Sequence, residues 1–408
     1  MTQITDLLAN QINNKQGSLI AFFEQEFNKT PAPLYNSVDI RNSGFKISAV
    51  DTNCFPAGFN NLSSSSIKKA QKQVAIFFAK NFPEAKNILI IPESHSRNLN
   101  YLQNVYNLQI ILSKVATVKI GTLIEEVKQP TRLKTFKNDE IEIHPIINED
   151  GRVFIHNFVP DVLILNNDLS EGLPNVLKKC KTPIIPNPNI GWYNRSKFNH
   201  FKEYNKIANQ VAEILEIDPW LISTIFDVCG NINFKESIGI DNLAQKVDEL
   251  LLNVQQKYQQ LNIDKDPYCF VKADSGTYGM AVWQVRSAAD ILAINKKDRN
   301  KMNVTKGSVI NTKVMIQEGI PTLHKIDKMA AESLIYMISG EVVGNLYRVN
   351  SNRDEISSLN SAGAIFYDGL DVDSSRITPK QEKDNLLIAN NLVSKIASLA
   401  SAREIKLT

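Results

Sequence analysis

Short apolar runs alternate with helical segments through the first 170 residues, and this alternation limits the fold more than any other feature of the chain. A helical repeat from Ile67 to Phe78 precedes an apolar run from Ile88 to Ile91 that ends at Pro92. Four similar runs follow and are expected to be strands: Gln109 to Leu112, Thr117 to Ile120, Ile141 to Ile146 and Val162 to Leu165. Apolar strands separated by helices predict an α/β layer with a mostly parallel sheet.

Polar clusters directly follow the first and the last of these runs. Residues 93–98 read Glu-Ser-His-Ser-Arg-Asn, and residues 166–168 read Asn-Asn-Asp. Ligands of open α/β sheets bind beyond the carboxyl ends of the strands, at the edge where such clusters would lie. The N-terminal half is therefore expected to bind a small polar ligand there.

The length of the chain predicts two domains. A chain of 408 residues exceeds what one hydrophobic core usually supports. A change from strand-rich to helical spacing places the boundary near residue 200, which gives domains over residues 1–200 and 201–408.

Composition excludes several classes of protein. The chain is 43% hydrophobic and 22% charged with a net charge of +3, which argues against disorder and against a nucleic-acid partner. Cysteines 54, 180, 229 and 269 lie far apart, without the paired spacing of a zinc site. The chain shows neither a signal peptide nor an apolar run of membrane-spanning length, so a cytoplasmic protein without a membrane partner is expected.

A glycine-containing loop in the second half resembles a phosphate-binding loop. Two strand-like segments, 268–273 and 280–285, flank it, and Lys272 lies at its start. Glycine lets backbone N–H groups approach phosphate oxygens, and the lysine supplies a point charge. An ordinary β-hairpin is the alternative interpretation. The candidate ATP-binding residues of this segment are Lys272, Asp274, Ser275, Gly276, Thr277, Tyr278 and Gly279.

Neither G-x-x-x-x-G-K-[ST] nor G-x-G-x-x-G occurs, so the loop is not part of a P-loop or dinucleotide fold. The order of the residues that follow it resembles the ATP-grasp superfamily. In that family such residues contact adenine, hold magnesium or reach the transferred phosphoryl group. The resemblance implies adenine contacts from Gln317, Glu318 and Ile320, a second phosphate-binding lysine at Lys235, a catalytic role for Arg348 beside Lys272, and magnesium ligands among Glu332, Glu355 and Asn360.

Segments of the N-terminal half narrow the resemblance. Residues 37–42 (SVDIRN), 50–62 (VDTNCFPAGFNNL), 91–98 (IPESHSRN) and 191–195 (GWYNR) are similar to the ATP-grasp type of proteobacterial glutamate–cysteine ligase. The resemblance spans nearly the whole chain. It implies an N-terminal Rossmann-like pre-ATP-grasp domain over residues 1–200 that binds substrate, and an ATP-grasp catalytic domain over 201–408.

The resemblance also implies a reaction. ATP and Mg²⁺ would convert the γ-carboxylate of L-glutamate to γ-glutamyl phosphate, and L-cysteine would then attack it. The products would be γ-glutamylcysteine, ADP and phosphate, in the first step of glutathione biosynthesis. A loop over residues 350–361 is expected to act as a lid that excludes water.

Amino-acid substrates require a guanidinium for the α-carboxylate and convergent acceptors for the α-ammonium. The candidates are Arg41, Asp51, Asn53, Asn60, Asn61, His95 and Arg97. Turn capping by the Asp and Asn side chains and surface ion pairing by the arginines are the alternative interpretations.

Two other functions stay open at the level of sequence. The chain resembles other ATP-grasp carboxylate–amine ligases, such as glutathione synthetase, in its ATP-binding half. A non-catalytic ATP-binding sensor is the second alternative. The oligomeric state is open as well, and a homo-oligomer is compatible with the sequence.

Overall fold

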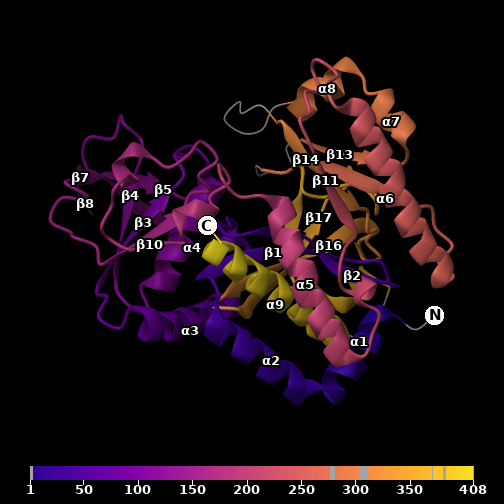
Figure 1. Cartoon of the computed structure of the whole chain (residues 1–408). Helices are drawn as coiled ribbons and strands as arrows, with labels where there is room; N and C mark the ends of the chain where they lie inside the picture. The colour runs from indigo at the N-terminus through magenta and orange to yellow at the C-terminus, as the bar shows by residue number, and fades with distance from the viewer. Residues whose placement is uncertain (1–2, 276–280, 304–310, 370, 380–382, 408) are drawn as a thin grey trace.

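The computed structural model describes residues 3–275, 281–303, 311–369, 371–379 and 383–407. Within these residues the larger sheets have seven, six and four strands, and each belongs to a distinct part of the molecule (Figure 1). We call these parts the central part, the α/β part and the clamp part.

The six-stranded sheet forms the core of the α/β part. Its strand order is β10-β9-β3-β4-β6-β5, and every neighbouring pair except β5–β6 is parallel. Its strands are β3 (Asn87–Pro92), β4 (Thr117–Thr122), β5 (Thr131–Lys134), β6 (Glu140–Pro145), β9 (Val162–Asn166) and β10 (Ile184–Ile185), and a separate hairpin joins β7 (Ile147–Glu149) to β8 (Arg152–Phe154). The mostly parallel sheet predicted for this half is therefore confirmed.

Helix α4 (Leu99–Leu112), which Asn98 caps, packs on this sheet. Helix α3 (Ser64–Asn81), which Ser63 caps, packs against α4 and against strands of the central part. The prediction of a strand over Gln109 to Leu112 was wrong, because these residues are the last turn of α4. Buried α4 residues such as Leu108 and Ile111 recur at helical spacing, and a short apolar run cannot by itself distinguish a strand from the end of a buried helix.

The seven-stranded sheet of the central part joins the two ends of the chain. Its main order is β18-β17-β16-β1-β2, and all of its pairs are antiparallel. Its strands are β1 (Tyr35–Asn42), β2 (Ile47–Asn53), β15 (Lys325–Ile326), β16 (Met329–Ile338), β17 (Glu341–Val349), β18 (Ile365–Asp368) and β19 (Ile377–Thr378). The pairing of β1 with β16 crosses the expected domain boundary near residue 200.

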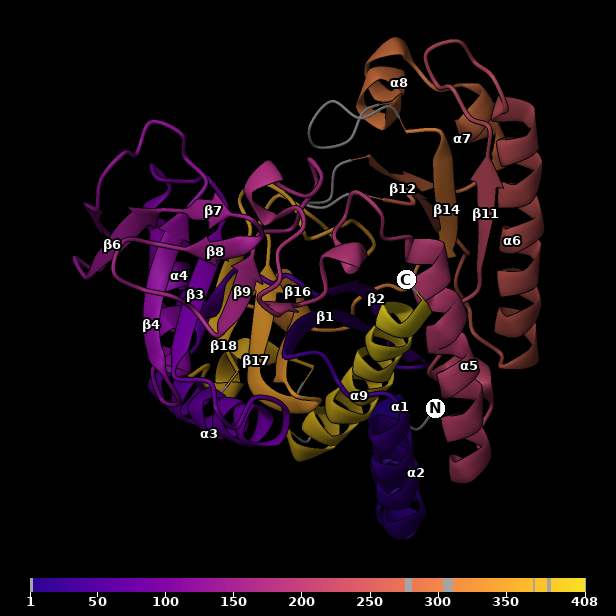
Figure 2. The same ribbon diagram turned by 60° about the vertical axis from the view of Figure 1, so that its left-hand side comes forward.

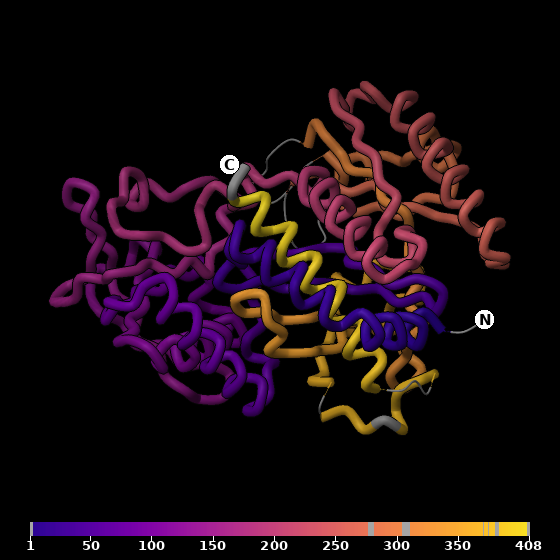
Figure 3. The backbone as a smooth tube through the Cα atoms, turned by 60° about the horizontal axis from the view of Figure 1, so that its bottom comes forward, coloured from indigo at the N-terminus to yellow at the C-terminus, as the bar shows by residue number. Residues whose placement is uncertain are grey.

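Four helices pack against the central sheet in one apolar core. They are α1 (Ile4–Asn14), α2 (Gln16–Lys29), α5 (Lys197–Leu215) and α9 (Lys383–Leu407). Figure 2 shows α9 lying beside α5 and across the sheet, and Figure 3 shows its C-terminal end reaching the α/β part. There Glu404 forms a buried ion pair with Arg195, 3.0 Å between carboxylate and guanidinium, which ties α9 to the chain that precedes α5.

The clamp part is a four-stranded antiparallel sheet with helices on its outer face. Its strand order is β11-β14-β12-β13. Its elements are β11 (Phe226–Gly230), α6 (Ile240–Gln260), β12 (Cys269–Ala273), β13 (Val282–Val285), α7 (Ala288–Leu292), α8 (Lys296–Asn303) and β14 (Lys313–Glu318). Apolar side chains of α6 bury one face of the sheet, which leaves the other face for the central part. Among the described helices, none is both long and apolar enough to cross a membrane.

Candidate active site

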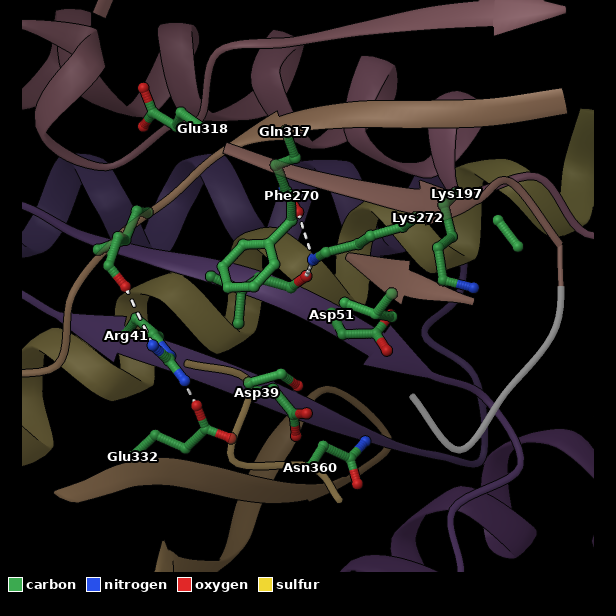
Figure 4. Close-up of a pocket in the computed structure, with 15 residues that line it drawn as sticks. Asp39, Arg41, Asp51, Lys197, Phe270, Lys272, Gln317, Glu318, Glu332 and Asn360 are labelled. Carbon is green, nitrogen blue, oxygen red and sulfur yellow. Dashed lines mark hydrogen bonds and ion pairs between the residues drawn. The ribbon is translucent and has the colours of Figure 1, made fainter. Parts of the chain in front are cut away.

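Two adjoining pockets lie where the three parts meet. The first pocket lies between the clamp sheet and the central sheet (Figure 4). The second pocket lies between the central sheet and the polar strand ends of the α/β part. Asp39, Asp51 and Asn360 line both pockets, so a group bound in one pocket can reach a group bound in the other at these three side chains.

Lys272 enters the first pocket from β12, between β13 and β14. Its ammonium donates to Gln317 Oε1 at 2.7 Å and to the Val50 carbonyl at 3.1 Å. Burial lowers the pKa of Lys272, although Asp51 and other carboxylates oppose the shift. The structure thus holds a desolvated cation in a fixed position, as phosphate binding requires.

The loop after Lys272 is described only at its start. The Asp274 carboxylate accepts from Ser196 Oγ at 3.0 Å and from Phe198 N at 2.9 Å, and it pairs with Lys313. Asp274 therefore fixes the beginning of α5, and its carboxylate is not directed at a phosphate. Ser275 follows it, and the remaining predicted loop residues, Gly276, Thr277, Tyr278 and Gly279, lie outside the described residues.

Gln317, Glu318 and Ile320 line the first pocket at the end of β14, as expected for an adenine-binding hinge. The Glu318 carboxylate is engaged elsewhere, because it pairs with the buried Lys46 and accepts from Trp220 Nε1 at 3.0 Å. Figure 4 shows this carboxylate apart from the other pocket side chains. The Glu318 carboxylate is therefore not free to bind a ligand, and its backbone N–H donates to the Ile225 carbonyl at 2.9 Å.

Four buried charged side chains form a continuous network of ion pairs along the two pockets. Arg41 Nε contacts Glu332 Oε2 at 2.7 Å, and Arg348 contacts Glu332 Oε1, also at 2.7 Å. Arg348 also holds both oxygens of Asp39, at 2.6 and 3.1 Å. Two guanidinium groups therefore balance two carboxylates in a site with little access to solvent.

The pKa values of the two carboxylates in this ion-pair network, Glu332 and Asp39, are shifted in opposite directions. Burial alone would raise the pKa of Glu332, but Arg41 and Arg348 together hold it below its usual value. Burial raises the pKa of Asp39 to about 6, although Arg348 opposes the shift. Glu332 contacts two arginines and Asp39 only one, which accounts for the difference.

The structure surrounds Arg41 with protein acceptors. Besides Glu332, its guanidinium donates to the carbonyls of Ile320 at 3.3 Å, Glu355 at 3.1 Å and Ser357 at 2.6 Å. Arg41 also lines the first pocket, and these contacts use four of the five N–H groups of a guanidinium. Its substrate-binding role stays a prediction, while its observed contacts connect the hinge after β14 to the loop expected to act as a lid.

Of the predicted metal ligands, Glu332 and Asn360 both line the first pocket and Glu355 does not. Both Glu332 oxygens contact an arginine, and Glu355 is exposed, 3.9 Å from Lys325. Asn360 does line both pockets, and Asp51 is the half-buried carboxylate that shares this position. In the part of the chain that the structure describes, no three His, Cys, Asp or Glu side chains are close enough to form a metal site by themselves. One carboxylate, one amide and nucleotide phosphates nevertheless suit Mg²⁺, which usually keeps several waters.

The second pocket brings together most of the predicted substrate residues. Five of them line it: Asp51, Asn53, Asn60, Asn61 and His95. His95 pairs with Glu93 at 2.7 Å, and Asn53 Oδ1 caps the backbone N–H of Phe55. Arg97 is exposed and lies outside the lining of either pocket.

Lys235 is not brought to the first pocket either. It is exposed at the turn between β11 and α6, whereas Lys197 at the start of α5 lines the pocket. Burial lowers the pKa of Lys197 to about 8, and its ammonium lies 4.0 Å from the centre of the Trp192 ring. Helical spacing gave no sign that Lys197 would be buried at this pocket.

Asp39 and Trp192 are further side chains that sequence reasoning missed. Asp39 lies on the same face of β1 as Arg41, and this polar alternation was the available signal. The buried Trp192 Nε1 and Arg348 Nε have no hydrogen-bond partner among the described residues, and both residues line the second pocket. Buried donors of this kind are stabilised by a bound polar ligand or water.

Gly58 shapes the second pocket. It has φ of +103°, and a Cβ at this position would lie 2.4 Å from Tyr336 Oη, on another residue that lines the pocket. We expect Gly58→Ala to raise the KM for the amino-acid substrates several-fold and to lower the thermal midpoint. Gly172→Ala is the matched control, since Gly172 has φ of +96° but no neighbour within 4 Å. Equal effects of both changes on KM would show that backbone strain alone, and not the contact with Tyr336, explains the result.

Comparisons with known proteins agree with this geometry. The glutamate–cysteine ligase family model matches residues 9–405. A solved structure from Methylobacillus flagellatus KT, described as a candidate gamma-glutamylcysteine synthetase, has 35% sequence identity and a TM-score of 0.91, and the match covers 99% of this chain and 96% of that chain. A search of curated proteins found no significant match.

Two more distant structures are also similar. D-alanyl-alanine synthetase A from Vibrio cholerae has 10% identity and a TM-score of 0.36, with 76% of this chain and 80% of that chain covered. A glutathione synthetase-like effector from Globodera pallida has 10% identity and a TM-score of 0.41, and the match covers 88% of this chain and 86% of that chain. These scores are too low to support an argument about function.

The family model and the Methylobacillus structure both extend over almost the whole chain, including both pockets. The expected α/β fold and the expected ligase activity are thereby confirmed. The chain belongs to the glutamate–cysteine ligase family.

Proposed function

We propose that the protein joins the γ-carboxylate of L-glutamate to the amino group of L-cysteine through γ-glutamyl phosphate, with ATP and Mg²⁺ as the driving reagents. The observation that carries this proposal is the junction of the two pockets at Asp39, Asp51 and Asn360. A pocket with a buried lysine suits the nucleotide, and a polar pocket that opens beside it suits the carboxylate substrate that accepts the phosphoryl group.

In the first pocket, the hinge backbone at Glu318 and Ile320 would contact adenine, while Lys272 neutralises phosphate charge. Lys197 adds a second cation at the same pocket. Asn360 and Asp51 would hold Mg²⁺, which shields the phosphate oxygens during transfer. Arg348 lies in the second pocket, next to the junction, where it can stabilise the charge that develops on the transferred phosphoryl group.

The second pocket would hold glutamate with its γ-carboxylate at the junction. Asn53, Asn60, Asn61 and His95 provide polar contacts for the amino-acid ends. Phosphorylation replaces an oxide leaving group with phosphate, so the cysteine amine can attack the carbonyl carbon of the γ-glutamyl phosphate directly. The protein then needs no nucleophile of its own, which agrees with the burial of Cys54 and the raised pKa that burial gives its thiol.

The test is ADP release with ATP, Mg²⁺ and L-glutamate, with and without L-cysteine. A parallel reaction contains γ-glutamylcysteine and glycine. We expect fast ADP release and formation of γ-glutamylcysteine only when glutamate and cysteine are both present. Turnover with the second pair alone would indicate a glutathione synthetase, and nucleotide binding without turnover of either pair would indicate a sensor.

A further inference from the structure

Arg41 connects two segments that contact different ligands. Its guanidinium donates to the Ile320 carbonyl at the hinge of the first pocket and to two carbonyls, those of Glu355 and Ser357, in the loop that follows β17. The same loop supplies Ser358 to the first pocket, and its Asn360 lines both pockets. The loop is therefore attached to the hinge through one buried side chain.

A second hydrogen bond joins the same two segments. The backbone N–H of Thr322 donates to the Glu355 carbonyl at 2.8 Å, so this carbonyl accepts from both Thr322 and Arg41. By contrast, the side chains of the loop are mostly exposed between residues 351 and 355. The position of residues 351–355 thus depends on the contacts of the Glu355 carbonyl to Arg41 and Thr322, because this segment has no apolar burial, whereas Leu359 further along the loop is fully buried.

Different nitrogens of the Arg41 guanidinium make the ion pair and the contacts to backbone carbonyls. Its Nε pairs with Glu332, which in turn holds Arg348. Its terminal nitrogens make the contacts to the hinge and to the loop. A lysine could keep the ion pair, but a single ammonium cannot reproduce contacts that diverge in the plane of a guanidinium.

We propose that Arg41 is a positioning residue that couples nucleotide binding at the hinge to closure of the loop over the acyl phosphate. This inference rests on the proposed function. A nucleotide that orders the hinge at Ile320 orders the loop through Arg41, and the loop then places Asn360 and Ser358 against the pockets. By linkage, glutamate and the nucleotide raise each other's affinity by the same factor.

Loss of this coupling has a chemical consequence. In a closed site the cysteine nitrogen attacks the carbonyl carbon of the acyl phosphate, the new C–N bond forms, and the C–O bond to phosphate breaks, with phosphate leaving with the electron pair and the amine losing a proton. In a loosened site water attacks the same carbon, and glutamate and phosphate are released, so one ATP is consumed without a peptide bond.

The test compares Arg41→Lys with the wild type in two measurements. The first is glutamate affinity with and without a non-hydrolysable ATP analogue and Mg²⁺. We expect a coupling factor of at least about 5 in the wild type, within the range usual for such coupling, and a factor near 1 in the variant. The second is the ratio of ADP formed to γ-glutamylcysteine formed, which we expect to be near one in the wild type and to rise several-fold in the variant.

Arg403→Lys is the matched control. Arg403 on α9 also pairs with carboxylates, those of Glu26 on α2 and Glu203 on α5, and none of these three residues lines either pocket. The change is expected to leave the coupling factor and the product ratio unchanged. If Arg41→Lys folds and retains both wild-type values, or if Arg403→Lys changes them equally, the proposal is wrong. A wild-type protein that forms no γ-glutamylcysteine would instead contradict the proposed function itself.

Discussion

Replacing Lys272 with alanine is expected to lower kcat by about two to three orders of magnitude while the fold remains intact. Lys272 lines the first pocket, and its ammonium is held between Gln317 and the Val50 carbonyl. In a site with little water a fixed charge stabilises developing phosphate charge far more than it would in bulk solvent. The measurement is ATP turnover with saturating glutamate and cysteine, beside a thermal unfolding curve.

Lys235→Ala is the matched control for this change. Both lysines are candidates for phosphate binding on sequence grounds, but Lys235 is exposed on the turn between β11 and α6. Its replacement is expected to leave kcat within a factor of about two, because an isolated surface charge contributes little. Near-normal turnover in Lys272→Ala, or an equal loss in both variants, would remove the assignment of the first pocket to the nucleotide.

Replacing Glu332 with alanine is expected to destabilise the protein by about 3–5 kcal/mol, the usual effect of removing one partner of a buried ion pair. The change would leave Arg41 and Arg348 buried with only Asp39 between them as a counter-ion. The free energy of unfolding, measured with denaturant in the absence of Mg²⁺, reports this effect directly. The ligase activity should fall together with the stability, because Arg348 loses Glu332, one of the two carboxylates that orient its guanidinium.

Glu355→Ala provides the comparison. Both glutamates are metal candidates by resemblance, but Glu355 is exposed, and its ion pair with Lys325 spans 3.9 Å. We expect a change in stability of less than about 0.5 kcal/mol. If Glu332→Ala were as stable as the wild type without Mg²⁺ yet required far more Mg²⁺ for activity, Glu332 would be a metal ligand and the ion-pair interpretation would fail.

The α/β layer was predictable because β3, β4, β6 and β9 contain short apolar runs, whereas β5 and β10, which carry no comparable signal, were not predicted. The central sheet was not, since its partners are distant in sequence and no local pattern indicates that β1 pairs with β16. An antiparallel strand carries the same alternation whichever strand it pairs with. For this reason the boundary near residue 200 describes the change in sequence pattern but does not describe the sheet.

The residues of the site also fall into those that a local sequence pattern indicates and those that depend on distant contacts. Lys272 and Asn360 were identifiable because short motifs carry them, and the Asp51 to Asn61 segment was identifiable from its unusual polarity. The role of Arg41 was not identifiable, because its acceptors are backbone carbonyls of residues 320, 355 and 357. Backbone acceptors leave no residue-type signal in a sequence. Burial of Lys197 likewise depends on the packing of three parts of the molecule.

The long-range pairing of β1 also limits the order in which the protein can assemble on the ribosome. Asp39 and Arg348 are 309 residues apart in the chain, so the N-terminal hairpin is synthesised long before its partner strand. Until Met329–Ile338 emerges, one edge of β1 has no neighbour, and Arg41 has no carboxylate to pair with. An unpaired strand edge is prone to associate with other chains. Nascent or truncated chains that end before β16 should therefore be the species that most require chaperone protection, and they cannot contain a complete active site.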